Sequence, residues 1–288
     1  DASRKLNEYE NPYFKNKNQN LFIEDIIKNL FKNKKISNNK IYEQAKNLNI
    51  GIVLTAHPTE VKRRTLIQKY ANLIKLTEER HLFKKYPSKI TEIDRKIYTE
   101  ITIIWKTDEL KRSKPSPLDE AKWGLAVIED SLWDTIPKVY KRLNDIFRIN
   151  LKKDLPRGFN PIQFGSWMGG DRDGNPNVTS EVTKKVILFS RWQAAKLYEK
   201  EFTKLIQDLS MKECSTQIQK VTGKTFEPYR VYLRPIRDKI RLTHQSIEKH
   251  LTKNVPLIND RLLQDKNEIL QPLRIVRDSL NLNRSQLI

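Results

Sequence analysis

The sequence predicts a predominantly α-helical protein with a few parallel strands, and three observations lead to that class. Apolar residues recur every three or four positions over long stretches, which is the period of a helix with one buried face. Only two short strand candidates, the β-branched run at 50–54 and the segment at 161–168, interrupt the pattern, and each leads into a loop and then another helical stretch. Because two strands alone do not make a stable sheet in water, we expect them to belong to a larger fold.

The first half of the chain is predicted to alternate between helix and strand. Residues 1–50 are polar, with apolar pairs about four positions apart that predict short amphipathic helices. After the strand at 50–54 we expect one helix over 61–79 and a longer one over 88–112. The longer one carries apolar residues that step by three and four: Ile90, Ile93, Ile97, Ile101, Ile104 and Trp105.

A proline-rich stretch at 113–117 separates that helix from the next. Ser116 is a suitable N-cap, and the proline after it fits the first helical position, where a missing N–H costs nothing. The helix is expected to continue to about Leu151, with a kink at Pro137, which cannot donate the helical hydrogen bond. A further long helix is predicted over 178–209.

The chain of 288 residues is strongly basic, with 55 Lys and Arg against 35 Asp and Glu and a net charge of +20. Such a charge is found in proteins that bind nucleic acid. Here the basic residues are mostly lysines scattered among Asn and Ile, without a zinc-finger, RNP-like or arginine-glycine pattern. We therefore expect no nucleic-acid partner, and keep a non-catalytic basic helical module that binds nucleic acid as the alternative.

Two further classes of protein are excluded by composition. No run of about 18 uncharged apolar residues occurs, so we expect no membrane span. The single cysteine, Cys214, excludes a disulfide framework and a cysteine-based metal site. A cytoplasmic location fits both observations.

Half of the eight glycines fall within ten residues of one another: Gly165, Gly169, Gly170 and Gly174. This cluster marks a place that needs unusual dihedral angles or close approach to a ligand. Inside it, Asp171 and Asp173 flank Arg172 and could orient its guanidinium toward a phosphate or carboxylate. Trp167, just before, could wall the site from water. The alternative is a structural turn whose Asp and Asn side chains bind their own backbone.

His57 follows the first strand and precedes a predicted helix. In β/α folds, side chains at the carboxyl ends of strands face the ligand crevice. The positive end of a helix disfavours imidazolium, and a neutral imidazole can act as a general base. A capping role without chemistry is equally compatible with this position. Together, the strand-end histidine and the Arg172 loop predict two walls of one site for a phosphorylated or carboxylated small molecule.

Four segments resemble phosphoenolpyruvate carboxylase of the bacterial type, in the family's own order. The most specific is F-G-S-W-M-G-G-D-R-D-G-N-P-N-V-T at 164–179. The others are V-L-T-A-H-P-T-E at 53–60 with the arginine pair at 63–64, the stretch 107–124, and E-P-Y-R at 227–230. The resemblance is strong from about residue 51 to residue 237.

This resemblance implies a carboxy-lyase that converts phosphoenolpyruvate and bicarbonate to oxaloacetate and phosphate, with Mg²⁺ or Mn²⁺. Such anaplerotic carbon dioxide fixation supplies the tricarboxylic acid cycle. The family fold is a helix-rich β/α barrel of the TIM type, and the enzymes are cytoplasmic homotetramers. We therefore expect residues 1–50 to be an N-terminal helical segment, and residues 51–288 to be the N-terminal portion of the barrel domain with long helical insertions.

The resemblance also assigns roles to individual residues. His57 matches the essential histidine, which assists the collapse of carboxyphosphate to CO₂ beside the enolate, and Trp167 and Arg172 match the loop that shapes the substrate pocket. Supporting roles fall to Glu60, Arg64, Asp171 and Asp173. The metal ligands are expected beyond Ile288, with none in this chain. We thus expect an N-terminal third of the enzyme that is inactive alone, and a truncated inactive carboxylase is the remaining alternative.

Overall fold

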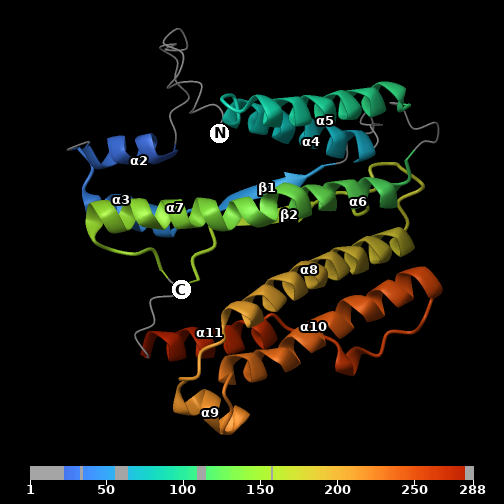
Figure 1. Cartoon of the computed structure of the whole chain (residues 1–288). Coiled ribbons are helices and arrows are strands. Elements are labelled where there is room, and N and C mark those ends of the chain that lie inside the picture. Colours follow the sequence, from blue (N-terminus) through green and yellow to red (C-terminus); the bar gives the residue numbers. More distant parts are fainter. Residues whose placement is uncertain (1–22, 33–34, 56–63, 109–114, 157, 283–288) are drawn as a thin grey trace. The chain divides into compact units, whose positions relative to one another are not determined.

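The computed structural model describes residues 23–32, 35–55, 64–108, 115–156 and 158–282. These residues are mostly helical with one pair of parallel strands, which confirms the predicted class at that level. The elements in chain order (Figure 1) are α2 (Ile23–Lys32), α3 (Asn38–Lys46), β1 (Ile50–Leu54), α4 (Arg64–Leu82), α5 (Pro87–Lys106), α6 (Pro117–Val127), the π-helical turn η2 (Ile128–Leu132), α7 (Trp133–Leu151), β2 (Ile162–Ser166), α8 (Ser180–Asp208), α9 (Thr216–Thr222), α10 (Pro228–Lys253), the 3₁₀ turn η3 (Asn259–Arg261) and α11 (Asn267–Leu282).

The chain forms two compact units, each with its own core. The first unit contains residues 1–116 and 130–167, and the second contains residues 117–129 and 168–288. The predicted boundary at residue 50 separates an N-terminal helical segment from the barrel portion of the complete protein. It stays a prediction. None of the described helices is long and apolar enough to cross a membrane.

In the first unit, α2 and α3 pack with α7 around Phe147. The ring of Phe147 meets Phe31 and Tyr42 edge to face, with centroids 5.6 and 6.0 Å apart. The Tyr42 hydroxyl donates to the carbonyl of Asp154 at 2.8 Å, which fixes the chain just after α7. The buried members of this core are Ile41, Tyr42, Leu143, Phe147 and Leu155.

The same unit holds the two strands, which run parallel in a register that pairs Ile50 with Ile162 and Leu54 with Ser166. Both coincide with the predicted runs, although β2 is shorter at each end. The apolar side chains of the pair remain exposed, among them Ile50, Ile52, Val53 and Phe164. A strand pair with exposed apolar faces fits the expectation that it belongs to a larger sheet.

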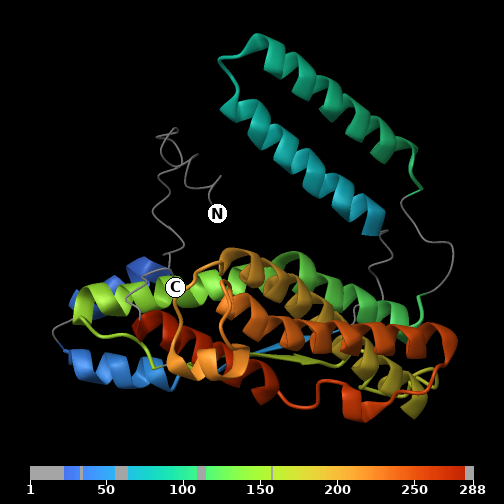
Figure 2. The same ribbon diagram turned by 60° about the horizontal axis from the view of Figure 1, so that its bottom comes forward.

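Helices α4 and α5 form an antiparallel hairpin (Figure 2). Ile93 of α5 is fully buried, and Leu66 of α4 is almost so. Two ion pairs bridge the helices, Lys69 with Glu100 at 3.1 Å and Arg80 with Asp94 at 2.5 Å. The helix α5 ends at Lys106, before the predicted end at 112.

The long helix predicted to end near Leu151 is interrupted at η2 rather than at Pro137. Pro137 lies inside α7. The helical partner of an N–H at this position would be the carbonyl of Trp133, the residue that directly follows the π-helical turn. We infer that the widened turn accommodates the missing bond, because π-helical turns are an established cause of helix irregularity.

The second unit is built on α8 and α10, which lie side by side, with α9 and α11 against them (Figure 1). Tyr229 at the start of α10 is fully buried, and its hydroxyl lies 2.8 Å from Ser279 Oγ, which also accepts from the Ser215 N–H at 2.7 Å. Cys214 packs partly buried beside this core, and burial raises the pKa of its thiol. One polar chain thus joins α10, α11 and the residue preceding α9.

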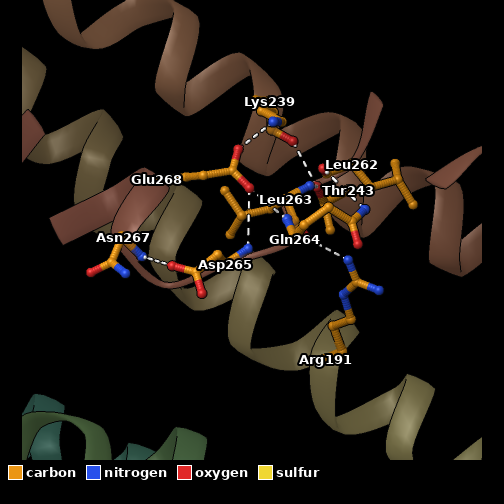
Figure 3. A network of polar contacts seen from close by, with 9 residues as sticks. All are labelled: Arg191, Lys239, Thr243, Leu262, Leu263, Gln264, Asp265, Asn267 and Glu268. Atoms are coloured by element: carbon orange, nitrogen blue, oxygen red, sulfur yellow. Dashed lines mark hydrogen bonds and ion pairs between the residues drawn. The ribbon is translucent and has the colours of Figure 1, made fainter. Parts of the chain in front are cut away.

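A second polar network fixes the turn between α10 and α11 (Figure 3). The carboxylate of Glu268 pairs with the Lys239 ammonium and accepts from the N–H groups of Gln264 and Asp265 at 2.7 and 3.1 Å. The Lys239 ammonium, followed by these N–H donors, lowers the pKa of Glu268. Arg191 of α8 binds the nearby carbonyl of Leu263. The carboxylate therefore holds the N-terminus of α11 against α10.

Candidate anion-binding site

The two candidate loops begin side by side at one end of the strand pair. β1 ends at Leu54 and β2 at Ser166, which are partners in the parallel register. The N–H of Trp167 then donates to the carbonyl of Leu54 at 3.0 Å. Since parallel strands end at the same edge of a sheet, the chain leaves both strands in the same direction. The site residues predicted from the sequence lie in the segments that follow the two strands at this edge.

The first loop carries the predicted histidine. His57 and Glu60 lie outside the described residues, and Arg64 is the first residue of α4. The described residues therefore give no distance between His57 and Arg172. Convergence of the two on one pocket stays a prediction.

The glycine-rich loop is anchored to α8 at Gly169. Gly169 has a φ of +69°, and a Cβ at this position would lie 2.5 Å from Val186 Cγ2. The Thr183 hydroxyl donates to the Gly169 carbonyl at 2.7 Å. Only glycine fits, because both the left-handed backbone and the close approach exclude a side chain. The sequence analysis did not identify Thr183 as part of the loop. The one local indication of its role is its position in the first turn of α8, four residues after the cap residue Thr179.

A tight turn follows from Arg172 to Asn175. The N–H of Asn175 donates to the carbonyl of Arg172 at 2.5 Å, and Asp173 and Gly174 have φ values of +33° and +75°. The side-chain oxygen of Asn175 accepts from the N–H of Asn177 at 3.0 Å. The expectation that polar side chains here bind their own backbone is therefore confirmed for Asn175.

The turn presents the Arg172 side chain to solvent, together with Asp171 and Asp173. Among the described residues, neither carboxylate forms an ion pair with the guanidinium, so the suggested fixed orientation is not seen. The planar fork of donors remains open to a carboxylate or phosphate. Trp167 is 58% exposed, so its indole does not close off water in this structure.

The loop ends at the N-terminus of α8. The Thr179 hydroxyl caps this helix by accepting from the Val182 N–H at 3.3 Å. The N-terminus of a helix carries partial positive charge and favours anions. Arg172 and the N-terminus of α8 therefore place a positive charge and a partial positive charge within eight residues of each other in the second unit. This local arrangement is suited to an anionic ligand.

A metal site is not formed by the described residues. Within the part of the chain that the structure describes, no group of three or more His, Cys, Asp or Glu side chains could hold a metal ion. These residues therefore do not fit the divalent cation of the resembled family.

The E-P-Y-R segment has a structural explanation. The Arg230 guanidinium donates to the carbonyls of Ile206 and Gln207 at 2.8 and 2.7 Å and pairs with Glu227 at 2.5 Å. Those carbonyls lie in the last turn of α8, where helical partners are missing. The segment thus closes the end of one helix with a side chain of another.

A glycine-rich loop after a parallel strand, with an exposed arginine beside a helix N-terminus, is an arrangement that can bind a small anion. The sequence profile of the family described as phosphoenolpyruvate carboxylase matches residues 2–288, and the chain belongs to this family.

Relatives with known names agree with this assignment. Phosphoenolpyruvate carboxylase of Acinetobacter baumannii is 41% identical over 251 residues, which is 87% of this chain and 28% of the relative. The enzymes of Pseudomonas aeruginosa and Alcanivorax borkumensis are 38% and 40% identical, over 91% and 90% of this chain and 30% and 29% of their own lengths. The chain therefore spans less than a third of these relatives.

Proposed function

We propose that this chain is the N-terminal part of a phosphoenolpyruvate carboxylase, which makes oxaloacetate and phosphate from phosphoenolpyruvate and bicarbonate. The observation that carries the proposal is the family match over residues 2–288. The side-by-side origin of the two motif-bearing loops at Leu54 and Ser166 supports it. In this proposal β1 and β2 are strands of a β/α barrel of the TIM type, completed by the rest of the polypeptide.

The site residues have distinct tasks in the proposed reaction. Transfer of the phosphoryl group from phosphoenolpyruvate to bicarbonate gives an enolate and carboxyphosphate. His57 assists the loss of phosphate from carboxyphosphate, and the enolate carbon then bonds to the released CO₂. Arg172 binds an anionic group of the substrate through its paired donors, and Trp167 shapes the pocket. Glu60, Arg64, Asp171 and Asp173 support this arrangement.

The divalent cation, Mg²⁺ or Mn²⁺, would neutralise charge that develops on the enolate. We place its ligands outside this chain. The proposal includes a cytoplasmic homotetramer that supplies the tricarboxylic acid cycle, and a 288-residue chain that is inactive alone.

Oxaloacetate formation by the full-length protein and by the 288-residue chain tests the proposal. We expect turnover only from the full-length protein. In that protein, His57→Asn should retain bicarbonate-dependent phosphate release and lose oxaloacetate formation. A full-length protein without carboxylation would overturn the function, and a His57→Asn variant with a normal rate would overturn the role of the histidine.

A further inference from the structure

The glycine-rich loop has two buried ends and an exposed middle. Met168 and Gly169 are buried at its start and Val178 at its end, whereas every residue from 170 to 177 is exposed. The exposed part carries Arg172, the proposed substrate-binding residue. The place at which Arg172 meets a ligand therefore depends on how the two ends of the loop are held.

At the first end, the loop is held by the hydroxyl group of Thr183 on α8. This hydroxyl lies 2.7 Å from the carbonyl oxygen of Gly169 and 3.2 Å from that of Thr179. It has a single hydrogen to donate, and 2.7 Å is the usual length of an O–H···O bond, so the hydrogen goes to Gly169. The carbonyl of Thr179 already accepts from the N–H of Thr183 at 3.0 Å. The hydroxyl of Thr183 thus serves the loop and is not needed by the helix.

This hydrogen bond fixes the direction of one peptide group. The bond between Gly169 and Gly170 is planar and trans, so a carbonyl held toward α8 makes the N–H of Gly170 point away from α8. The close contact with Val186 limits how near the loop comes to the helix, but van der Waals contact alone does not set the rotation of a peptide. The hydroxyl of Thr183 supplies that rotation, and with it the direction in which the chain leaves toward Arg172.

We propose that Thr183 is a positioning residue for the substrate-binding loop. The proposal rests on the proposed function, because it takes Arg172 to bind the anionic substrate. Thr183 acts through Arg172 and does not itself touch the substrate. Without the hydroxyl, the buried carbonyl of Gly169 loses its donor, and the peptide turns to find another. The paired donors of Arg172 then miss the substrate, and small displacements of a binding group are costly for catalysis.

Kinetics of the full-length protein test the role of the hydroxyl. Thr183→Val replaces it with a methyl group and keeps the branched shape, and we expect kcat/KM for phosphoenolpyruvate to fall about 10-fold. Thr183→Ser keeps the hydroxyl and should restore most of the activity. The matched control is Thr203→Val, because Thr203 of α8 donates to the carbonyl of Glu199 at 2.8 Å, within the helix. We expect wild-type kinetics from this control, and a normal kcat/KM for Thr183→Val would overturn the proposal.

A double-mutant cycle separates positioning of Arg172 from a general loss of structure. If Thr183 acts through Arg172, then Thr183→Val should change kcat/KM little in an Arg172→Ala background. Independent effects would instead multiply, so that the same factor of about 10 is lost in both backgrounds. That result would contradict the proposal.

Amide hydrogen exchange of the full-length protein gives a measurement that needs no activity. Residues 168–178 should exchange faster in Thr183→Val than in Thr183→Ser or Thr203→Val, as followed by mass spectrometry. Faster exchange in a protein that forms no oxaloacetate would overturn the proposed function and keep Thr183 as the residue that holds the loop. Unchanged exchange in an active protein would refute the positioning role alone.

Discussion

The guanidinium of Arg230 lies 2.8 Å from the main-chain carbonyl of Ile206, and the side chain of one helix thereby completes the end of another. Its second nitrogen reaches the neighbouring carbonyl of Gln207 at 2.7 Å. Carbonyls in the last turn of a helix lack intrahelical partners, and basic side chains stabilise them by hydrogen bonding and by their charge. A segment that resembles an enzyme motif is thus explained by helix packing.

Arg230→Ala should lower the free energy of unfolding by about 2 kcal/mol, since charged hydrogen bonds to two carbonyls are lost. Arg230→Lys should recover only part of this, because one ammonium lacks the planar fork that spans both acceptors. Urea denaturation followed by circular dichroism measures the change. Arg234→Ala is the matched control, since it removes the same charge from an exposed position of α10. Equal losses from Arg230→Ala and Arg234→Ala would contradict the structural role.

Gly169→Ala should destabilise the glycine-rich loop more than Gly174→Ala. Both positions have positive φ, so both variants carry the left-handed strain of about 1–2 kcal/mol. Only at Gly169 does the added methyl also meet Val186, at 2.5 Å, whereas nothing lies within 4 Å at Gly174. Thermal unfolding of the two variants gives the difference. Val186→Ala in the Gly169→Ala background should recover part of the loss, and the same midpoint for both single variants would refute the close contact.

Glu268 should make stability depend on acid pH. Its pKa is lowered in the folded chain, first by Lys239 and then by backbone donors. The resulting stability is complete above the unfolded value of about 4.3 and is lost as the pH falls through the folded pKa. Glu268→Gln should therefore cost about 1 kcal/mol at neutral pH and show a shallower loss below about pH 4. Urea titrations at several pH values test this, with Asp278→Asn as an exposed control; parallel curves for wild type and Glu268→Gln would speak against it.

Arg172→Ala should lower kcat/KM of the full-length enzyme by about 30-fold, which corresponds to about 2 kcal/mol of lost transition-state binding. Arg172→Lys should restore only part of the activity, because an ammonium does not present two parallel donors. Stability should not change, since the side chain is exposed. Lys184→Ala, an exposed change of the same charge on α8, is the control. An unchanged kcat/KM for Arg172→Ala would leave the arginine without a role in binding.

The regular elements could be predicted because their signals are local. The β-branched run at 50–54 formed a strand with the predicted bounds. The long helical period predicted the start of α5 at residue 88, next to its observed start at Pro87, but placed its end at 112, beyond Lys106. The interruption before α7 could not be placed from Pro137 alone. A missing N–H predicts that a helix must adjust, but which neighbouring turn widens depends on the packing of the whole helix.

The candidate site was predictable only in part, for a similar reason. The cluster of glycines marked the loop, and the positive φ values of Gly169 and Gly174 explain two of them. The contact that makes Gly169 irreplaceable comes from Val186, 17 residues further on, which no local pattern reports. Likewise, alternating charges around Arg172 suggested ion pairs, whereas the turn points the three side chains to solvent.

The sheltered sulfur of Cys214 has a practical consequence. Its raised pKa keeps the thiol protonated at neutral pH, and a protonated thiol reacts slowly with maleimides and iodoacetamides. A cysteine introduced at a solvent-facing position such as Lys184 should be modified first. Fluorescent or spin reporters could therefore be attached at one chosen place while the native residue is kept.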